Sequence, residues 1–301
     1  MDNLAHTVIG IGVARAGLSQ RFGPGTTLAL AVSSNLPDID VLWAFWDPMD
    51  RFLLRRTHSH ALIMLPVLAA LLASALRWRR PQRSWTVLFG LSALGIALHL
   101  FFDVVNSFGV VLLWPFSPQR FELASIFIID LFIWGVMIAP MLAARFLKSD
   151  EARRRGYQVA VATLGLYGVL CIGAHARAEG LARDPKATAL RVFPEPLGPH
   201  RFRAATRVGD AWHVSLIHVL GGSVEPCEVV HTDEAAPRVA EVRASPSGRR
   251  LERFMAAPVW TLASDGGVEV YDLRFNSRVV VRNGTFVVRF PAGRTEPSWN
   301  P

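Results

Sequence analysis

Imidazole and carboxylate side chains recur within the apolar first half of this 301-residue chain. They are His6, Asp38, Asp40, His58, His60, His99, Asp103 and Asp130. An ionisable side chain inside a membrane-spanning region costs at least ~2.5–3.5 kcal/mol on insertion scales, so each one indicates a function. Histidine nitrogens and carboxylate oxygens suit zinc or manganese as ligands. The set therefore suggests a divalent-metal site.

His99 and Asp103 form the first pair of candidate ligands. They are four residues apart in an apolar helical stretch, so both lie on one helix face, and Asn106 extends that face. Side chains at this spacing converge and can chelate one ion or bridge two. A buried His–Asp hydrogen bond in a helix bundle explains the pair equally well when it is considered alone.

Asp38 and Asp40 flank a turn that begins at Pro37. The proline prevents the preceding helix from continuing regularly, so the two aspartates are expected on a turn or at a new helix start. Capping of a helix N-terminus by a carboxylate is one explanation. Two negative charges beside an apolar stretch need a cation, however, and this favours metal ligation.

The segment Thr57-His58-Ser59-His60 precedes an apolar run. Thr57 is expected to cap that helix, which would direct His58 to the membrane face. His58 and His60 cannot share a helix face, so at most one is a direct ligand. None of the ionisable residues has an obvious lysine or arginine partner at helical spacing. Unpaired carboxylates in apolar surroundings would be far too costly, so a metal site is favoured over a structural polar network.

The elements that must position these residues are membrane helices. The chain is 51% hydrophobic and 19% charged, with a mean hydropathy of +0.30. This excludes a disordered chain, and with only Cys171 and Cys227 present we expect no disulfide scaffold. Four segments are predicted to span a bilayer: Ala61–Leu76 with its flanks, Trp85–Trp114, Phe121–Phe146 and Tyr157–Ala176. Two others, Leu4–Leu18 and Thr26–Trp46, are predicted to be short, half-embedded helices.

Arginines set the expected topology. One cluster lies between Arg77 and Arg83 and another between Arg145 and Arg155, each in a short loop at span ends. The positive-inside rule places both loops on the cytoplasmic side of a membrane protein surrounded by lipids. Clusters at span ends are anchors, so the net charge of +8 does not indicate nucleic-acid binding. The last span would then export the C-terminal part.

The sequence therefore predicts a mainly α, polytopic membrane helix bundle of about four to six segments, with a small C-terminal β domain. The domains are residues 1–176, a Pro- and Gly-rich linker with loops at 177–210, and a soluble, extracytoplasmic, β-rich domain at 211–301. Alternating patterns predict strands over Trp212–Leu220, Val268–Phe275, Arg278–Arg282 and Thr285–Phe290, with a turn at Asn283-Gly284.

Several motifs together resemble the YdjM-type family of membrane-bound metal-dependent hydrolases, over about residues 1–145. They are His6, Asn35-Leu-Pro-Asp-Ile-Asp40, Thr57-His58-Ser59, His99-x3-Asp103 and the run Phe108–Ser117. The resemblance implies a divalent-metal site with His6, Asp38, His58, His99 and Asp103 as ligands. The family usually has His-Arg-Gly shortly before Thr-His-Ser, whereas this chain has Leu53-Leu54-Arg55 there.

The expected function is hydrolysis of a phosphoester or lipid-type substrate, assisted by zinc, with manganese as the second choice. A carboxylate that is not fully engaged, Asp40 or Asp130, is expected to act as general base. Two alternatives stay open. One is a non-catalytic, metal-stabilised scaffold whose exported domain binds an envelope partner. The other is a metal or proton transporter, for which inverted repeats would be expected; the sequence shows no internal repeat.

Overall fold

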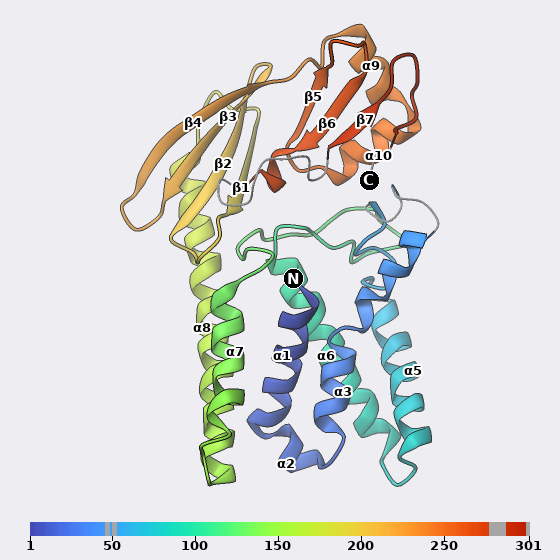
Figure 1. The fold of residues 1–301 in the computed structure, drawn as a ribbon, viewed down its shortest axis with the longest axis vertical. Coiled ribbons are helices and arrows are strands. Elements are labelled where there is room, and N and C mark those ends of the chain that lie inside the picture. Colours follow the sequence, from blue (N-terminus) through green and yellow to red (C-terminus); the bar gives the residue numbers. More distant parts are fainter. Residues whose placement is uncertain (46–48, 50–52, 277–286, 299–301) are drawn as a thin grey trace. The chain divides into compact units, whose positions relative to one another are not determined.

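A computed structural model describes residues 1–45, 49, 53–276 and 287–298. The chain divides into two compact units, a helical unit formed mainly by residues 1–172 and a mixed α and β unit formed mainly by residues 173–301. Figure 1 shows the elements of both units. The boundary falls within one long helix.

The first 45 residues of the helical unit form short helices. Helix α1 (Asn3–Val13) continues through a π-helical turn (Ala14–Leu18) into α2 (Ser19–Phe22). Helix α3 (Thr26–Ser33) is followed by the 3₁₀ segment η2 (Leu36–Phe45), which contains Pro37. Pro37 thus interrupts regular α-helix as the sequence predicted; Trp46, the last residue of that predicted segment, lies outside the described residues.

Four longer helices follow: α5 (Met64–Arg79), α6 (Trp85–Val105), α7 (Leu131–Ala143) and α8 (Asp150–Ala182). Helices α6 and α8 are long and apolar enough to cross a membrane, and α7 is a shorter apolar helix. The membrane helix bundle is therefore supported by two candidate spans in the described part of the chain. The predicted number of four to six segments is not confirmed.

Residues 106–130 are irregular, although two predicted spans reached into this stretch. Helix α6 ends at Val105, and the next residue, Asn106, has an extended backbone and lies nine residues before Pro115. Helix α7 does not begin until Asp130, whose side chain accepts the backbone N–H groups of Phe132 and Ile133 at 2.9 and 3.1 Å. A polar cap and two prolines therefore divide what hydropathy alone treats as apolar runs.

Helices α1, α3 and α6 pack at backbone distance. A Cβ added to Gly10 of α1 would lie 2.7 Å from the carbonyl oxygen of Leu30 in α3. A Cβ added to Gly95 of α6 would overlap the Oγ of Ser33. Small residues permit this close approach between helices. The contact fixes the end of α3, and with it Ser34, against the second half of α6.

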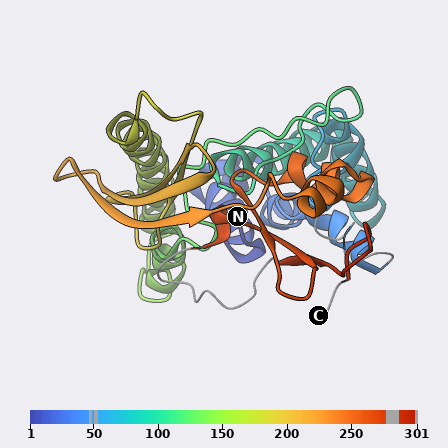
Figure 2. The same ribbon diagram turned by 90° about the horizontal axis from the view of Figure 1, so that it is seen from above.

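The other unit contains two antiparallel sheets. The first has the order β1 (Ala189–Pro194), β2 (Arg201–Val208), β3 (Ala211–His218) and β4 (Ser223–His231), and Figures 1 and 2 show its twist. The second contains β5 (Pro258–Leu262), β6 (Val268–Asp272) and β7 (Val288–Phe290). Its described residues also form helices α9 (Pro237–Ala244) and α10 (Pro246–Phe254) and the 3₁₀ turn η3 (Leu273–Phe275).

Strands β1 and β2 lie where the sequence predicted a linker with loops. The prolines that suggested a linker flank or end the strands, while Val192 and Phe193 of β1 and Phe202 of β2 are buried in the cores of this unit. The predicted strands at Trp212–Leu220 and Val268–Phe275 correspond to β3 and β6, which end at His218 and Asp272. The predicted strand Thr285–Phe290 corresponds to β7 in its described part, and its residues 285 and 286 lie outside the described residues. The predicted strand Arg278–Arg282 and the turn Asn283-Gly284 lie outside the described residues.

Candidate metal centre

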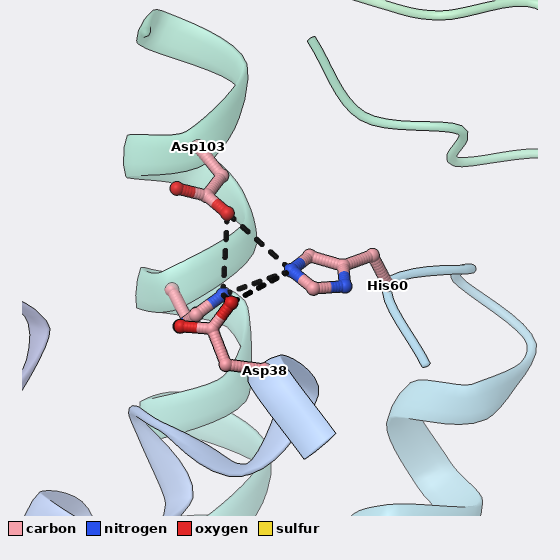
Figure 3. Close-up of side chains that lie close together, drawn as sticks. Asp38, His60 and Asp103 are labelled. Atoms are coloured by element: carbon pink, nitrogen blue, oxygen red, sulfur yellow. Dashed lines mark hydrogen bonds and ion pairs between the residues drawn. The ribbon is translucent and has the colours of Figure 1, made fainter. Parts of the chain in front are cut away.

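Four buried side chains converge beside the second half of α6. His99 and Asp103 project from one face of α6, one turn apart, as their spacing predicted. Asp38 comes from η2, and His60 comes from the turns that precede α5. Each residue offers one donor atom, and all four atoms lie within 4.8 Å of one another. Figure 3 shows Asp38, His60 and Asp103 with the interactions that join the cluster.

The distances fit one small cation. The Nε2 atoms of His60 and His99 are 3.1 Å apart, and Asp103 Oδ2 is 3.4 and 3.3 Å from them. Asp38 Oδ1 lies farther out, 3.8 Å from His60 Nε2 and 4.0 Å from His99 Nε2. Ligands on a tetrahedron with zinc bonds of about 2.0–2.1 Å are about 3.3 Å apart. Three of the donors already have this spacing.

Hydrogen bonds on the far side of each imidazole orient the pair. The Nδ1 of His60 is 3.1 Å from Asp40 Oδ2, and the Nδ1 of His99 is 2.7 Å from the backbone carbonyl oxygen of Ser34. Both acceptors favour an N–H at Nδ1, which leaves the two Nε2 lone pairs facing each other. Such acceptors commonly fix the tautomer of a metal-binding histidine. A proton on one Nε2 would join the two nitrogens by a hydrogen bond, whereas with both nitrogens unprotonated a cation between them would bind both lone pairs.

The charges around the cluster also call for a cation. Asp38, Asp40 and Asp103 are all buried. The guanidinium of Arg56, itself buried, approaches Asp103 with its Nε 2.9 Å from Oδ2. The amino group of Met1 also contacts Asp103, but burial and then Arg56 lower its pKa to about 6. With the three carboxylates ionised and the imidazoles neutral, as metal binding requires, the carboxylates carry two more charges than the guanidinium of Arg56 balances. One divalent cation would neutralise these two charges.

Two further observations agree with this surplus of negative charge. Burial lowers the pKa of His60, but hydrogen bonds to Asp103 and Asp40 outweigh it, so the pKa is raised. Within the described part of the chain, Asp38 Oδ2 and Asp40 Oδ1 are buried without a hydrogen-bond partner. Buried acceptors without partners are costly, and a positively charged ligand would stabilise them. The residues present therefore fit a divalent metal.

The comparison with protein families agrees with the membrane fold. A family model described as YdjM inner membrane protein matches residues 1–178. The chain belongs to the YdjM inner membrane protein family. The matched region contains all four donors and both candidate spans begin in it, which supports a membrane location. No curated protein and no solved structure matches the chain.

In this YdjM-family chain, three of the five predicted ligands belong to the four-donor cluster: Asp38, His99 and Asp103. His6 lies next to it. Its ring stacks on His99 with the centroids 3.8 Å apart, and its Nε2 is 3.2 Å from Asp103 Oδ1, the oxygen that points away from the other donors. His6 therefore contacts two of the donor residues, His99 and Asp103, without being one of the four donors.

His58 lies outside the four-donor cluster, and His60 is there instead. The ring of His58 packs edge-on against Trp114, with the centroids 4.8 Å apart. The sequence argument assumed a helix capped by Thr57, but α5 begins only at Met64. Residues 54–63 form turns, and Arg56 has a positive φ of 57°. In this irregular backbone the helical spacing that favoured His58 does not apply.

The two aspartates predicted as general bases have other partners in this YdjM-family chain. Asp40 Oδ2 accepts the backbone N–H of Arg56 at 2.6 Å and faces His60. Asp130 caps α7 and accepts a hydrogen bond from the hydroxyl of Tyr167 at 2.7 Å. Sequence reasoning missed Arg56 as the partner of Asp103, because it searched for a basic residue at helical spacing. The Arg55-Arg56 pair beside Thr57 was the available signal.

Proposed function

We propose that this YdjM-family protein is a membrane metal-dependent hydrolase, acting on a phosphoester or lipid-type substrate at the cluster of Asp38, His60, His99 and Asp103. The observation that carries the proposal is the uneven spacing of the donors. His60, His99 and Asp103 form a triangle with sides of 3.1 to 3.4 Å, and Asp38 lies farther away. Two histidines and one carboxylate are a ligand set that catalytic zinc sites use.

A bound divalent cation would supply a water of lowered pKa and would polarise a phosphoryl or acyl oxygen. Asp38 is the residue placed to accept the proton from that water. Its side chain is 7% exposed, whereas those of His60, His99 and Asp103 are fully buried. Its Oδ2 has no hydrogen-bond partner among the described residues. In this proposal Asp40 instead orients His60, and Asp130 holds the start of α7.

The position of the cluster along α6 suggests which leaflet the substrate comes from. His99 is 14 residues from Trp85, the start of α6, and this corresponds to about 21 Å of helix. The arginines that precede Trp85 are expected on the cytoplasmic side. We therefore propose that the centre faces the extracytoplasmic leaflet, where a lipid or a lipid-linked phosphate reaches it, and that the C-terminal unit lies on the same side of the membrane.

A second function, a metal-stabilised scaffold, is favoured by one feature of the same centre. All four donor residues are buried. A structural zinc site is closed by four protein ligands, whereas a catalytic site keeps a position for water or substrate. If Asp38 moves inward to become a fourth ligand, the cation would hold η2, α6 and the turns around His60 together and would do no chemistry.

The test begins with the full-length chain in detergent, with the metal content measured by mass spectrometry. The variants are His99→Ala, Asp38→Asn and, as a control outside the centre, Asp130→Asn. Hydrolysis of a generic phosphodiester and of phospholipid vesicles is then assayed with zinc and with manganese. The hydrolase predicts that His99→Ala loses metal, that Asp38→Asn keeps metal but loses about 10²–10⁴-fold in rate, and that Asp130→Asn keeps both.

Cobalt substitution separates the two functions when no substrate is hydrolysed. An accessible coordination position would make the visible spectrum of the cobalt-loaded protein respond to added phosphate. If cobalt binds stoichiometrically but its spectrum does not change when phosphate is added, and no substrate is hydrolysed, the hydrolase proposal is wrong and the scaffold function is favoured.

A further inference from the structure

A basic pocket lies within the helical unit, apart from the metal centre and with no residue in common with it. It has a volume of about 560 Å³ and lies where the π-helical turn after α1, the end of α7 and the start of α8 meet. Its charged lining consists of Arg15, Arg145, Arg153, Arg154 and Asp150. Three separate elements of the fold therefore direct arginines into one cavity.

Contacts within the unit hold several of these side chains in place. Arg15 donates from Nη1 to the hydroxyl of Tyr157 at 2.8 Å, which joins the π-helical turn to α8. Arg153 donates from Nε to the carbonyl oxygen of Leu147 at 2.9 Å and pairs with Asp150 at 3.1 Å. Arg15 and Arg153 are therefore already ordered by contacts within the protein, which lowers the entropy cost of ordering the pocket when a ligand binds.

The charge of the pocket is unbalanced. Four guanidinium groups face one carboxylate, and Asp150 is paired with Arg153. The Nε of Arg154 is buried, and no group in the described part of the chain accepts a hydrogen bond from it. A buried donor without an acceptor is costly. A ligand with several negatively charged oxygens would satisfy this donor and neutralise the surplus charge.

The geometry of guanidinium and the surroundings narrow the class of ligand. The planar fork of arginine matches phosphate oxygens and forms charge-assisted hydrogen bonds with them. Two large apolar side chains that follow lining residues directly in the chain are exposed: Leu142, after Met141, at 52%, and Phe146, after Arg145, at 84%. A free phosphate would leave these apolar side chains exposed to solvent, whereas the acyl chain of a lipid would cover them. Basic pockets between membrane helices on the cytoplasmic side bind anionic headgroups in this way.

We propose that this pocket binds the phosphate of an anionic phospholipid headgroup in the cytoplasmic leaflet. Arg145 and Arg154 contact the phosphate, Arg15 and Arg153 hold the walls, and Leu142 and Phe146 lie along the acyl chain. The inference does not depend on the metal centre or on hydrolysis. It depends on the pocket residues and on the expected cytoplasmic position of their loop.

Binding can be measured on the full-length chain in detergent by native mass spectrometry, with phosphatidylglycerol, phosphatidylcholine and inorganic phosphate as probes. The test variant is Arg145→Gln with Arg154→Gln. The control, Arg79→Gln with Arg155→Gln, removes the same charge; Arg79 and Arg155 are exposed and outside the pocket lining. We expect the test variant to bind phosphatidylglycerol about 100-fold more weakly, or about tenfold per arginine, and the control to change by less than about threefold.

Other outcomes would overturn the proposal. Equal losses in both variants would mean that only net charge attracts the lipid. Equal affinity for phosphatidylglycerol and phosphatidylcholine would exclude an anionic headgroup site, and inorganic phosphate binding as tightly as phosphatidylglycerol would exclude the lipid as the source of the phosphate. Arg154→Lys keeps the charge but loses the planar fork of donors, so we expect it to bind phosphatidylglycerol more weakly. This milder variant tests the site even if the double variant does not fold, and unchanged binding would count against a contact between Arg154 and the phosphate.

Discussion

Exchanging one histidine at a time at positions 58 and 60 tests whether the cluster is the metal centre. The sequence alone favoured His58, whereas the structure brings His60 Nε2 to within 3.1 to 3.8 Å of the other three donors. Glutamine approximates the size of the histidine side chain, so His60→Gln and His58→Gln remove an imidazole at two positions of the same segment. Because His58 packs against Trp114, its replacement removes no donor from the cluster.

The magnitude follows from the number of donors. Structural zinc sites bind with apparent free energies of about 10–16 kcal/mol at pH 7. An equal share for each of the four positions of a tetrahedral site is about 2.5–4 kcal/mol, which corresponds to a factor of about 10²–10³ in Kd. We therefore expect His60→Gln to weaken metal binding by that factor, and His58→Gln to change it by less than about threefold.

The assay is titration of the metal-loaded protein in detergent with a chelator of known affinity, and mass spectrometry gives the stoichiometry. We expect one divalent ion per chain, because one such ion neutralises the buried charge. The reasoning fails if His58→Gln releases the metal while His60→Gln retains it. A stoichiometry of two would show that the charge balance around Arg56 and the three carboxylates is wrong.

Two further predictions concern residues that support the centre. Asp40→Asn removes the carboxylate behind His60 and should weaken metal binding by about 10–100-fold while one ion per chain still binds at saturation; unchanged affinity would show that Asp40 does not orient the ligand. Gly10→Ala forces a methyl group against the carbonyl oxygen of Leu30 and should lower the free energy of unfolding by about 1–3 kcal/mol. Gly90→Ala is the matched control, because a Cβ there meets nothing within 4 Å, and equal unfolding midpoints for the two variants would contradict the packing argument.

The parts of the centre that lie on regular helix could be predicted from the sequence. His99 and Asp103 share a face because the spacing of a helix is fixed, and the break at Pro37 follows from the missing N–H of proline. The choice of His60 over His58 could not be predicted, because residues 54–63 have no regular period. Tertiary contacts set the backbone there, such as the hydrogen bond from Val111 N–H to the Arg56 carbonyl oxygen.

The lengths of the spans show the same limit of local reasoning. Hydropathy predicted continuous apolar segments through Trp114 and from Phe121, but the structure has helix only up to Val105 and again from Leu131. Hydropathy averages over a window and gives little weight to a single polar cap such as Asp130. The C-terminal linker was also too long in the prediction, since proline content cannot distinguish a linker from strands that prolines flank.

The backbone-distance packing at Gly10 and Gly95 also bears on how the buried centre can exchange with its surroundings. Helices that contact through glycine have no side-chain layer between them, so they must separate as whole bodies or remain together. The opposite wall, residues 54–63, is joined to the stretch after α6 by backbone hydrogen bonds such as the one from Leu62 N–H to the Leu112 carbonyl oxygen. Local opening of a protein follows its least protected segments, and residues 54–63 have no regular helical hydrogen bonding. Exchange of a bound ion should therefore require breaking the few backbone hydrogen bonds of this segment rather than separating the glycine-packed helices.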